Sequence, residues 1–337
     1  MPVDNDYTNN NKPLFPKGRL ASRIGTFRQL EILMAVAETG GIVAAAERLH
    51  LSQPSVSMQM RKLAESIGLP LYEMVGRRMT LTHAGELVFA HAKEIFACTD
   101  RLEMSLNQLQ GLLLGKLSIG IVSSAEYFSP HLLGPFCRRY PQIEISLEFG
   151  NRKNILQRMQ QNLDDLYIFG YPPQEQDIEA TSMGINHLVL IAPHSHPLAA
   201  QSSLTWQDLS NELFILREEG SGTRLATELQ LAKLGHSLDK HINIASNEGI
   251  KHAVLARMGL AIVPALSLDE GNQKDVVQLP VEGFPLSDNW HVVNRKDKVF
   301  SVIAKLCRDY LLGEGKNMVD EATQYWEKNH KPKLPTR

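Results

Sequence analysis

The residues best suited to chemistry lie at the start of one predicted helix, where short hydrogen-bonding side chains follow a helix cap. Ser52 is a typical capping residue and Pro54 suits a first helical turn, so the spacing predicts a helix from there to about Glu65. Apolar residues three and four apart should bury one face and leave an adjacent polar face free. Such a helix fits the major groove of DNA, where it can contact base edges and phosphates. The candidate contacts are Ser52, Gln53, Ser55, Ser57, Gln59 and Lys62.

Two adjacent arginines offer positive charge close to that helix. Segment 71–81 carries Gly76-Arg77-Arg78 at its centre, a pattern typical of a short two-stranded wing. We expect Arg77 and Arg78, together with Lys62, to hold the phosphate backbone of DNA, which positions a protein without reading sequence. A solvated helix face with no partner is the alternative interpretation of these polar residues.

Three loops in the second half of the chain are suited to bind an anion. Ser123-Ser124 follows a predicted strand, while segments 150–152 (Gly-Asn-Arg) and 220–223 (Gly-Ser-Gly-Thr) each open a helix. Hydroxyls and free backbone N–H groups at helix starts attract negative charge, and Arg224 and Lys251 could add positive charge. A simple turn with a cap is the alternative for the glycine-rich run. The candidate ligand contacts are Ser123, Ser124, Asn151, Arg152, Gly170, Ser221, Gly222, Thr223, Arg224 and Asn247.

Signatures of enzymes and metal sites are missing from the sequence. It contains no G-x-S-x-G nucleophile elbow, no P-loop, no H-E-x-x-H pair and no C-x-x-C pair. His194 and His196 precede Pro197 without an evident third ligand, so a loop after a strand is the expected explanation. We therefore expect neither an enzyme nor a bound cofactor.

Length and composition are those of a multidomain globular protein. At 337 residues the chain exceeds one ordinary core, and its net charge of −2 argues against a protein that coats nucleic acid non-specifically. Residues 26–92 hold six Arg/Lys and six Asp/Glu, so one copy should bind DNA weakly and an oligomer should be needed. Neither a membrane span nor a secretory signal is evident, and Cys98, Cys137 and Cys307 are expected to be buried free thiols. A cytoplasmic protein is expected.

A helical zone surrounds the polar helix. Thr26 is a typical cap, apolar residues recur at helical spacing after it, and Gly40-Gly41 ends that first helix. The run 43–49 predicts a second short helix, and His50-Leu51 forms a tight turn into the third. Two short helices, a turn and a capped third helix make a helix-turn-helix pattern.

A long helix should follow the wing, with Thr82 as its cap. Apolar residues then recur with strict seven-residue spacing, which favours pairing with a second helix in a coiled coil. An ordinary amphipathic helix is the alternative. The repeat consists of Val88, Ile95, Leu102 and Leu109. We expect a dimerisation helix that ends near Gly115.

From residue 116 the pattern alternates between short apolar strands and helices. This alternation predicts α/β architecture with parallel sheets, in two small lobes with a binding site between them. Strands are expected at 117–122, 144–149, 165–169, 187–192, 212–216, 241–245 and 260–263, and helices at 130–140, 151–162, 222–234 and 248–258. The expected divisions are an arm at 1–23, the helix-turn-helix domain at 24–82, the linker helix at 83–115, the two-lobed domain at 116–312 (one lobe at about 116–180 and 293–312, the other at about 181–292) and a tail at 313–337. The tail is polar and charged, and a terminal helix and a partly disordered segment are its two alternatives.

Residues 26–85 resemble, along their whole length, the DNA-binding domain of LysR-type transcription regulators. The matching motifs are Ala-Ala-Glu-Arg-Leu at 45–49, Ser-Gln-Pro-Ser-Val-Ser at 52–57 and Leu-Thr-x-x-Gly at 81–85. Many members have a basic residue after Leu-Phe-Glu, whereas this chain has Met74 there, so that contact should pass to Arg77 and Arg78. The resemblance covers about 24–312. It implies a winged helix-turn-helix, a linker helix and a two-lobed effector domain of the periplasmic-binding-protein type.

Within that family, the second half is most similar to regulators of the RuBisCO operon. The matching stretches are LSIGIVSSAEYFSPHLL at 117–133, FGNRKNILQRMQQNLDDLYIFGYPP at 149–173 and Ile-Ala-Pro-His-x-His-Pro-Leu at 191–198. This resemblance implies control of carbon-fixation genes and a small anionic effector, such as a phosphorylated metabolite or NADPH. It also implies a homotetramer, built as a dimer of dimers on partly palindromic double-stranded DNA, with RNA polymerase as a further partner and no membrane.

Three other functions remain open. The chain could regulate a different metabolic operon with another effector, it could be a two-lobed solute-binding protein, or it could be an enzyme fused to a DNA-binding domain. The attached helix-turn-helix and the missing secretory signal argue against the second, and the missing catalytic motifs argue against the third.

Overall fold

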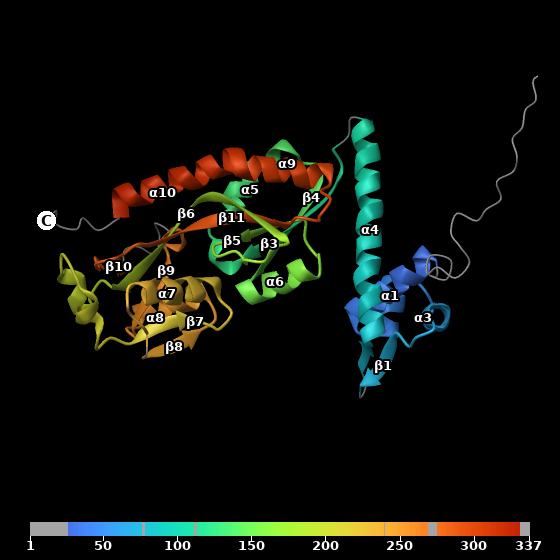
Figure 1. Cartoon of the computed structure of the whole chain (residues 1–337), viewed down its shortest axis with the longest axis horizontal. Coiled ribbons are helices and arrows are strands. Elements are labelled where there is room, and N and C mark those ends of the chain that lie inside the picture. The colour runs from blue at the N-terminus through green and yellow to red at the C-terminus, as the bar shows by residue number, and fades with distance from the viewer. Residues whose placement is uncertain (1–25, 76–77, 111–112, 239, 269–274, 331–337) are drawn as a thin grey trace, which may run out of the picture. The chain divides into compact units, whose positions relative to one another are not determined.

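The computed structural model divides into two compact units, Met1–Asp100 and Arg101–Arg337 (Figure 1). It describes residues 26–75, 78–110, 113–238, 240–268 and 275–330, with only the backbone of Val75, Arg78 and His330. The predicted arm at 1–23 and the last seven residues of the predicted tail lie outside these ranges.

Helix caps define the first unit, which contains α1 (Phe27–Thr39), α2 (Ile42–Arg48) and α3 (Gln53–Ile67). Thr26 and Gln29 form a reciprocal capping box at the start of α1, and Gly40 ends that helix with a φ of 75°, a left-handed conformation that suits glycine. The Ser52 hydroxyl accepts a hydrogen bond from the N–H of Ser55 and so begins α3. The predicted caps at Thr26 and Ser52 are confirmed.

One core joins these three helices. Val56, Met60 and Leu63 of α3 are fully buried, as their spacing predicted, and they belong to the same cluster as Leu33 of α1 and Ala45 of α2. The small side chain of Ala45 allows α2 to pack closely. The polar residues of α3 are therefore held on a helix whose orientation is fixed by its apolar face.

A two-stranded wing follows, with β1 (Tyr72–Val75) antiparallel to β2 (Arg78–Leu81). Thr82 then caps α4 (His83–Leu109), because its hydroxyl accepts a hydrogen bond from the N–H of Gly85 at 3.1 Å and donates one to the carbonyl of Pro70 at 2.6 Å. Arg77 and the side chain of Arg78 lie outside the described part of the chain, so their predicted phosphate contacts stay predictions.

Helix α4 ends earlier than its sequence predicted. Its last residue is Leu109, and Gly115 already begins a strand with a φ of 153° beside Met104. A Cβ at position 115 would approach the Met104 side chain to 2.8 Å, so glycine is required where β3 begins after α4. The predicted end near Gly115 was wrong because the packing of that glycine cannot be read from helical periodicity.

The second unit is built on one mixed sheet. Its strands are β3 (Gly115–Val122), β4 (Ile143–Gly150), β5 (Leu166–Phe169), β6 (Ile178–Pro193), β7 (Phe214–Arg217), β8 (His241–Ile244), β9 (Leu260–Pro264), β10 (Val276–Gln278) and β11 (Leu286–Arg295). They follow the order β4-β3-β5-β11-β6-β9-β7-β8, and β10 pairs with β6. Strands β3, β4 and β5 are parallel, as are β7, β8 and β9, but β6 and β11 pair antiparallel between the two groups. The prediction of parallel sheets was therefore correct only within each group.

Two lobes form around the two groups of parallel strands. Lobe I contains β3, β4 and β5 with α5 (Ser129–Arg139), α6 (Arg152–Gln160) and α9 (Val302–Tyr310). Lobe II contains β7, β8 and β9 with α7 (Gly222–Lys233) and α8 (Asn247–Leu255). Strands β6 and β11 cross between the lobes (Figure 1). The predicted fold class, a winged helix-turn-helix followed by a two-lobed α/β domain, is confirmed.

The C-terminal segment is part of the second unit rather than a tail. Helix α9 continues through a π-helical turn at Leu311–Gly315 into α10 (Lys316–His330), so the predicted boundary at 312 divides one helical run. Helix α10 lies along β6 (Figure 1), and it buries Val319 in the core of lobe I and Trp326 in a core of lobe II. The alternative of a terminal helix is therefore confirmed as far as His330. The packing of that helix on both lobes was missed, because helical spacing such as that of Val319, Ala322 and Trp326 shows an apolar face but not the surface that covers it.

The thiols differ in exposure. Cys307 is buried, but Cys98 and Cys137 are exposed, so the prediction of buried thiols was wrong for two of the three. The described residues contain no group of three or more His, Cys, Asp or Glu side chains placed to hold a metal ion. In the same residues no single helix is long and apolar enough to cross a membrane; α1 and α2 pass that test only together, across a bend of 118°.

Candidate functional site

The predicted DNA contacts occupy two flanks of α3. At 100° per residue, Gln53 and Ser57 lie on one side of the buried stripe, whereas Ser55 and Gln59 lie on the other. Lys62 is exposed. The hydroxyl oxygens of Ser52 and Ser55 are 2.9 Å apart and hydrogen-bond to each other. Both side chains therefore take part in the cap of α3 as well as in its exposed polar surface.

Gln59 is not free, contrary to its prediction. Its side-chain oxygen accepts a hydrogen bond of 2.9 Å from the Nε2 atom of Gln29 on α1. The oxygen of Gln29 in turn accepts one of 3.0 Å from the backbone N–H of Thr26. Sequence reasoning missed Gln29, although its place three residues after the capping Thr26 is the pattern of a capping box.

A second set of polar residues lines a pocket between the lobes of the second unit. Five of the predicted ligand contacts meet there: Ser124, Arg152, Gly170, Gly222 and Thr223. Its interior volume is about 10 Å³, room for roughly one water molecule. A larger ligand can therefore enter only if the side chains or the lobes move apart.

Gly170 shows how tightly this pocket is packed. A Cβ at that position would lie 3.0 Å from Nδ2 of Asn186 and 3.0 Å from a ring carbon of Trp290. Asn186 lines the pocket but was not predicted, because it lies on β6, one of the crossing strands, whose first half has no apolar alternation. Glycine at 170 thus lets Asn186 and Trp290 approach the end of β5.

Arg152 separates the inner pocket from an outer cavity of about 310 Å³. Its Nε atom donates a hydrogen bond of 3.0 Å to the carbonyl of Tyr171, and partial burial lowers the pKa of its guanidinium. The outer cavity is also lined by Ser221, which caps α7, and by Arg224. Both cavities therefore meet at the starts of α6 and α7, where backbone N–H groups favour anions.

Two of the predicted cations are already paired. Arg224 donates from Nε to Glu228 at 2.7 Å and from Nη1 to Asn243 at 3.0 Å. Lys251 is buried, bonds to the carbonyl of Ser267 at 3.0 Å and lies over the ring of Tyr127. It lines neither of the two cavities.

Arg217 connects two of the predicted contacts and was missed. It is the last residue of β7, and its side chain is only 3% exposed. Its Nη1 atom donates to Asn247 at 2.7 Å in lobe II, and its Nη2 atom donates to Ser123 at 3.1 Å in lobe I. A single arginine at the end of an apolar strand was the signal that could have identified it.

Glu218, the next residue, brings a carboxylate into the same place. Nε and Nη2 of Arg217 donate to its two oxygens at 2.8 and 3.1 Å, and Nδ2 of Asn151 donates to one of them at 3.1 Å. Burial would raise the pKa of Glu218, but the hydrogen bonds and charge of Arg217 outweigh it, so the pKa lies below its usual value. The carboxylate is ionised at neutral pH.

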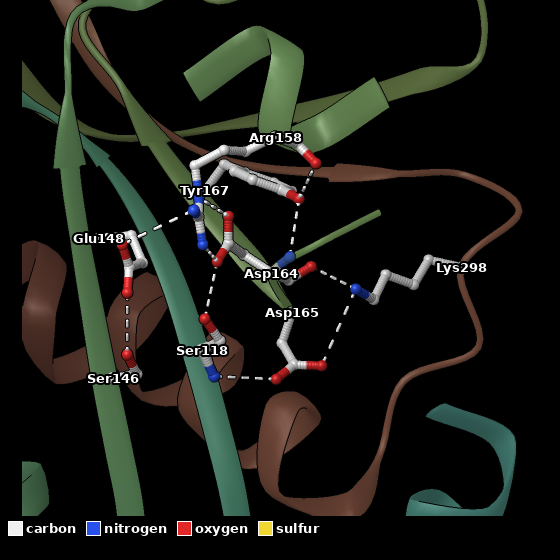
Figure 2. A network of polar contacts seen from close by, with 8 residues as sticks. All are labelled: Ser118, Ser146, Glu148, Arg158, Asp164, Asp165, Tyr167 and Lys298. Carbon is white, nitrogen blue, oxygen red and sulfur yellow. Dashed lines mark hydrogen bonds and ion pairs between the residues drawn. The ribbon is translucent and has the colours of Figure 1, made fainter. Parts of the chain in front are cut away.

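A separate polar network stabilises lobe I where α6 meets β3 and the residues that precede β5 (Figure 2). Arg158 of α6 donates two bonds, of 2.9 and 2.8 Å, to Asp164, whose side chain also accepts a bond of 2.7 Å from the Ser118 hydroxyl. Burial lowers the pKa of Lys298, which lies beside Asp165. These residues tie α6 to the starts of β3 and β5, so we assign them to stability rather than to ligand binding.

Comparison with known families gives two matches that together span most of the chain. Residues 27–86 match the bacterial regulatory helix-turn-helix protein model of the lysR family, and residues 110–316 match the LysR substrate binding domain. Helix α10 extends beyond the second match.

Similar proteins include transcription regulators of similar length. The HTH-type transcriptional activator CmpR of a Synechocystis species is 43% identical over 287 residues, which cover 85% of this chain and 94% of CmpR. The RuBisCO operon transcriptional regulator of Allochromatium vinosum is 38% identical over 294 residues, 87% of this chain and 97% of that protein. A solved structure of the Synechocystis CcmR regulatory domain in complex with 2-PG is 39% identical, with a TM-score of 0.57 over 60% of this chain and 98% of that domain.

Proposed function

Because the chain belongs to the LysR family of bacterial transcription regulators, we propose that it controls carbon-fixation genes in response to a small phosphorylated anion. The observation that carries this proposal is the similarity to CmpR and to a RuBisCO operon regulator over nearly their whole length. The relatives are regulators rather than enzymes, in agreement with the missing catalytic motifs. A solute-binding protein is not supported, since the helix-turn-helix is part of the family match.

DNA binding rests on α3 and the wing. In this proposal the polar side chains of α3 contact base edges and phosphates, and they are Gln53, Ser55, Ser57 and Gln59. Lys62 contacts phosphate, and Arg77 and Arg78 hold the backbone beside the wing. Residues 26–92 are neutral in their net charge, so two or more copies must bind together to reach useful affinity. The chain then acts in the cytoplasm as a dimer of dimers on a partly palindromic site, from which it assists or blocks RNA polymerase.

The effector is proposed to bind between the lobes. The hydroxyls of Ser124 and Thr223, the guanidinium of Arg152 and the start of α7 offer hydrogen bonds and positive charge to an anion. Because the inner pocket has room for only about one water molecule, binding must select a state in which the lobes or side chains are farther apart. That difference between states is what allows the ligand to change the DNA-bound assembly.

A two-part experiment tests this function. The full chain is titrated against promoter DNA upstream of carbon-fixation genes and against random DNA of equal length, at several salt concentrations, with and without 2-phosphoglycolate or 2-phosphoglycerate. Specific binding at least ~10³-fold tighter than random binding, with a footprint altered by either compound, is the expected result. Equal affinity for both DNAs would refute carbon-fixation promoters as the target. If neither compound alters the footprint or the melting temperature of the full chain, the proposed effector class is refuted.

A further inference from the structure

An anion that belongs to the chain lies beside the proposed effector site, since its partner Arg217 bonds to Ser123, the neighbour of the pocket residue Ser124. Glu218 presents both carboxylate oxygens to the buried Arg217, in the two-pronged geometry by which arginine binds carboxylates and phosphates most strongly. The other bonds of this guanidinium go to Ser123 and Asn247, two residues expected to contact a ligand. The positive charge that bonds to those residues is therefore paired with a carboxylate of the chain itself.

The surroundings of this carboxylate are those that an anionic ligand would require. Asn151 caps α6 with its side-chain oxygen and donates its amide to Glu218, so the carboxylate lies beside the first turn of that helix. The loop that carries Glu218 is held there by a backbone bond of 3.1 Å from Lys153 to Gly220. An arginine fork, an amide donor and a helix start together form an anion site.

We infer that Glu218 is an internal counter-ion of the effector site, which occupies Arg217 when no effector is bound and must be displaced by an anionic effector. This inference rests on the proposed function, because it requires that the effector be an anion bound between the lobes. Displacement breaks the bond from Asn151 in lobe I to Glu218 in lobe II, so ligand binding is coupled to the contact between the lobes. Glu218 thereby sets the affinity threshold of the site and excludes anions too weak to compete with it.

The test compares two variants that each remove one negative charge. Glu218→Gln keeps the size of the side chain and an oxygen that can accept from Asn151, but it loses the charge that competes for Arg217. Glu282→Gln removes an exposed charge that lines neither cavity. The full chain and both variants are titrated with 2-phosphoglycolate, 2-phosphoglycerate and inorganic phosphate, with the rise in melting temperature as the measure of binding.

Glu218→Gln should bind these anions about tenfold more tightly than the parent, the effect of releasing one charge-assisted bond. Glu282→Gln should differ from the parent by less than about twofold, because an exposed charge that lines neither cavity is screened by salt. If Glu218→Gln binds the anions no more tightly than the parent, or if both variants gain equally, the inference is overturned. Binding of the anions by the parent still supports the effector class in that case. If the parent binds none of the probes but Glu218→Gln does, the inference stands and the effector class is wrong. If neither binds, both are refuted.

Discussion

The side-chain amide of Gln29 donates a hydrogen bond of 2.9 Å to the side-chain oxygen of Gln59, and so joins the first helix of the helix-turn-helix to the third. The oxygen of Gln29 accepts from the backbone N–H of Thr26, a group that can only donate. The orientation of both amides follows from this, and the NH₂ group of Gln59 is left as the donor. The start of α1 thus controls a side chain on the DNA-binding helix.

Substitution of Gln29 should therefore affect DNA recognition from a position outside α3. Gln29→Glu keeps an oxygen for the cap at Thr26 but cannot donate to Gln59, whereas Gln29→Ala loses both. We expect Gln29→Ala to lower the free energy of unfolding by about 1–2 kcal/mol and Gln29→Glu to lower it less. Both should weaken binding to specific DNA more than to random DNA in gel-shift titrations. Specific binding equal to the parent in both variants would show that the Gln29–Gln59 bond has no role in recognition.

The linker helix should be covered by a second copy. Val88 and Ile95 of its heptad pack against the core of the first unit, but Leu102 is 60% and Leu109 is 84% exposed. Leu109→Lys should weaken self-association of the full chain by at least about tenfold, because it places a charge in an apolar contact. Sedimentation over a range of concentrations measures this.

The matched control is Gln108→Lys, which adds the same charge at an exposed position that does not belong to the apolar repeat. It should sediment like the parent. Ile95 is a poor choice for this test, because its substitution would also disturb the core of the first unit. If Leu109→Lys associates as the parent does, the heptad is not the dimer contact and α4 is an ordinary amphipathic helix.

The pocket hydroxyl of Thr223 should be needed for effector binding. Thr223→Val preserves its size but removes one hydrogen bond to an anion, so the affinity for a phosphorylated acid should fall about tenfold. Thr227→Val, one turn later on α7, is the control, since Thr227 is buried but does not line the pocket. Calorimetric titration of the full chain should separate the two variants, and equal affinities would remove Thr223 from the site.

The C-terminal helix should stabilise the lobes. Trp326 is 4% exposed and packs beside His187 of β6, with ring centroids 5.1 Å apart, so Trp326→Ala should cost about 3–5 kcal/mol. Gln324→Ala, at an exposed position of the same helix, should change stability by less than about 0.5 kcal/mol. Urea unfolding followed by circular dichroism measures both. A loss of less than 1 kcal/mol for Trp326→Ala would mean that α10 contributes little to the packing of lobe II.

The sequence by itself determined the local structure of the DNA-binding unit. Caps such as Ser52 and Thr82 act on the next few residues, and the apolar spacing of Val56, Met60 and Leu63 identifies a buried face without any distant information. The same is true of the short strands and helices of each lobe, whose apolar runs are local. Five of the predicted ligand contacts meet in one pocket because each lies at the end of such an element.

Only the tertiary structure decided what joins these elements. The mixed sheet depends on the pairing of β6 with β11, whose partners Ile178 and Arg295 are far apart in the sequence. Only the apolar second half of β6, at 187–192, was predicted as a strand, because the first half of β6 and much of β11 are polar. The cluster of Arg217, Glu218 and Asn151 has the same origin, since a charge at the end of an apolar strand has no local partner that explains it. The role of this cluster depends on Asn151 of the other lobe, because the burial and pairing of charges are set by groups that only folding brings together.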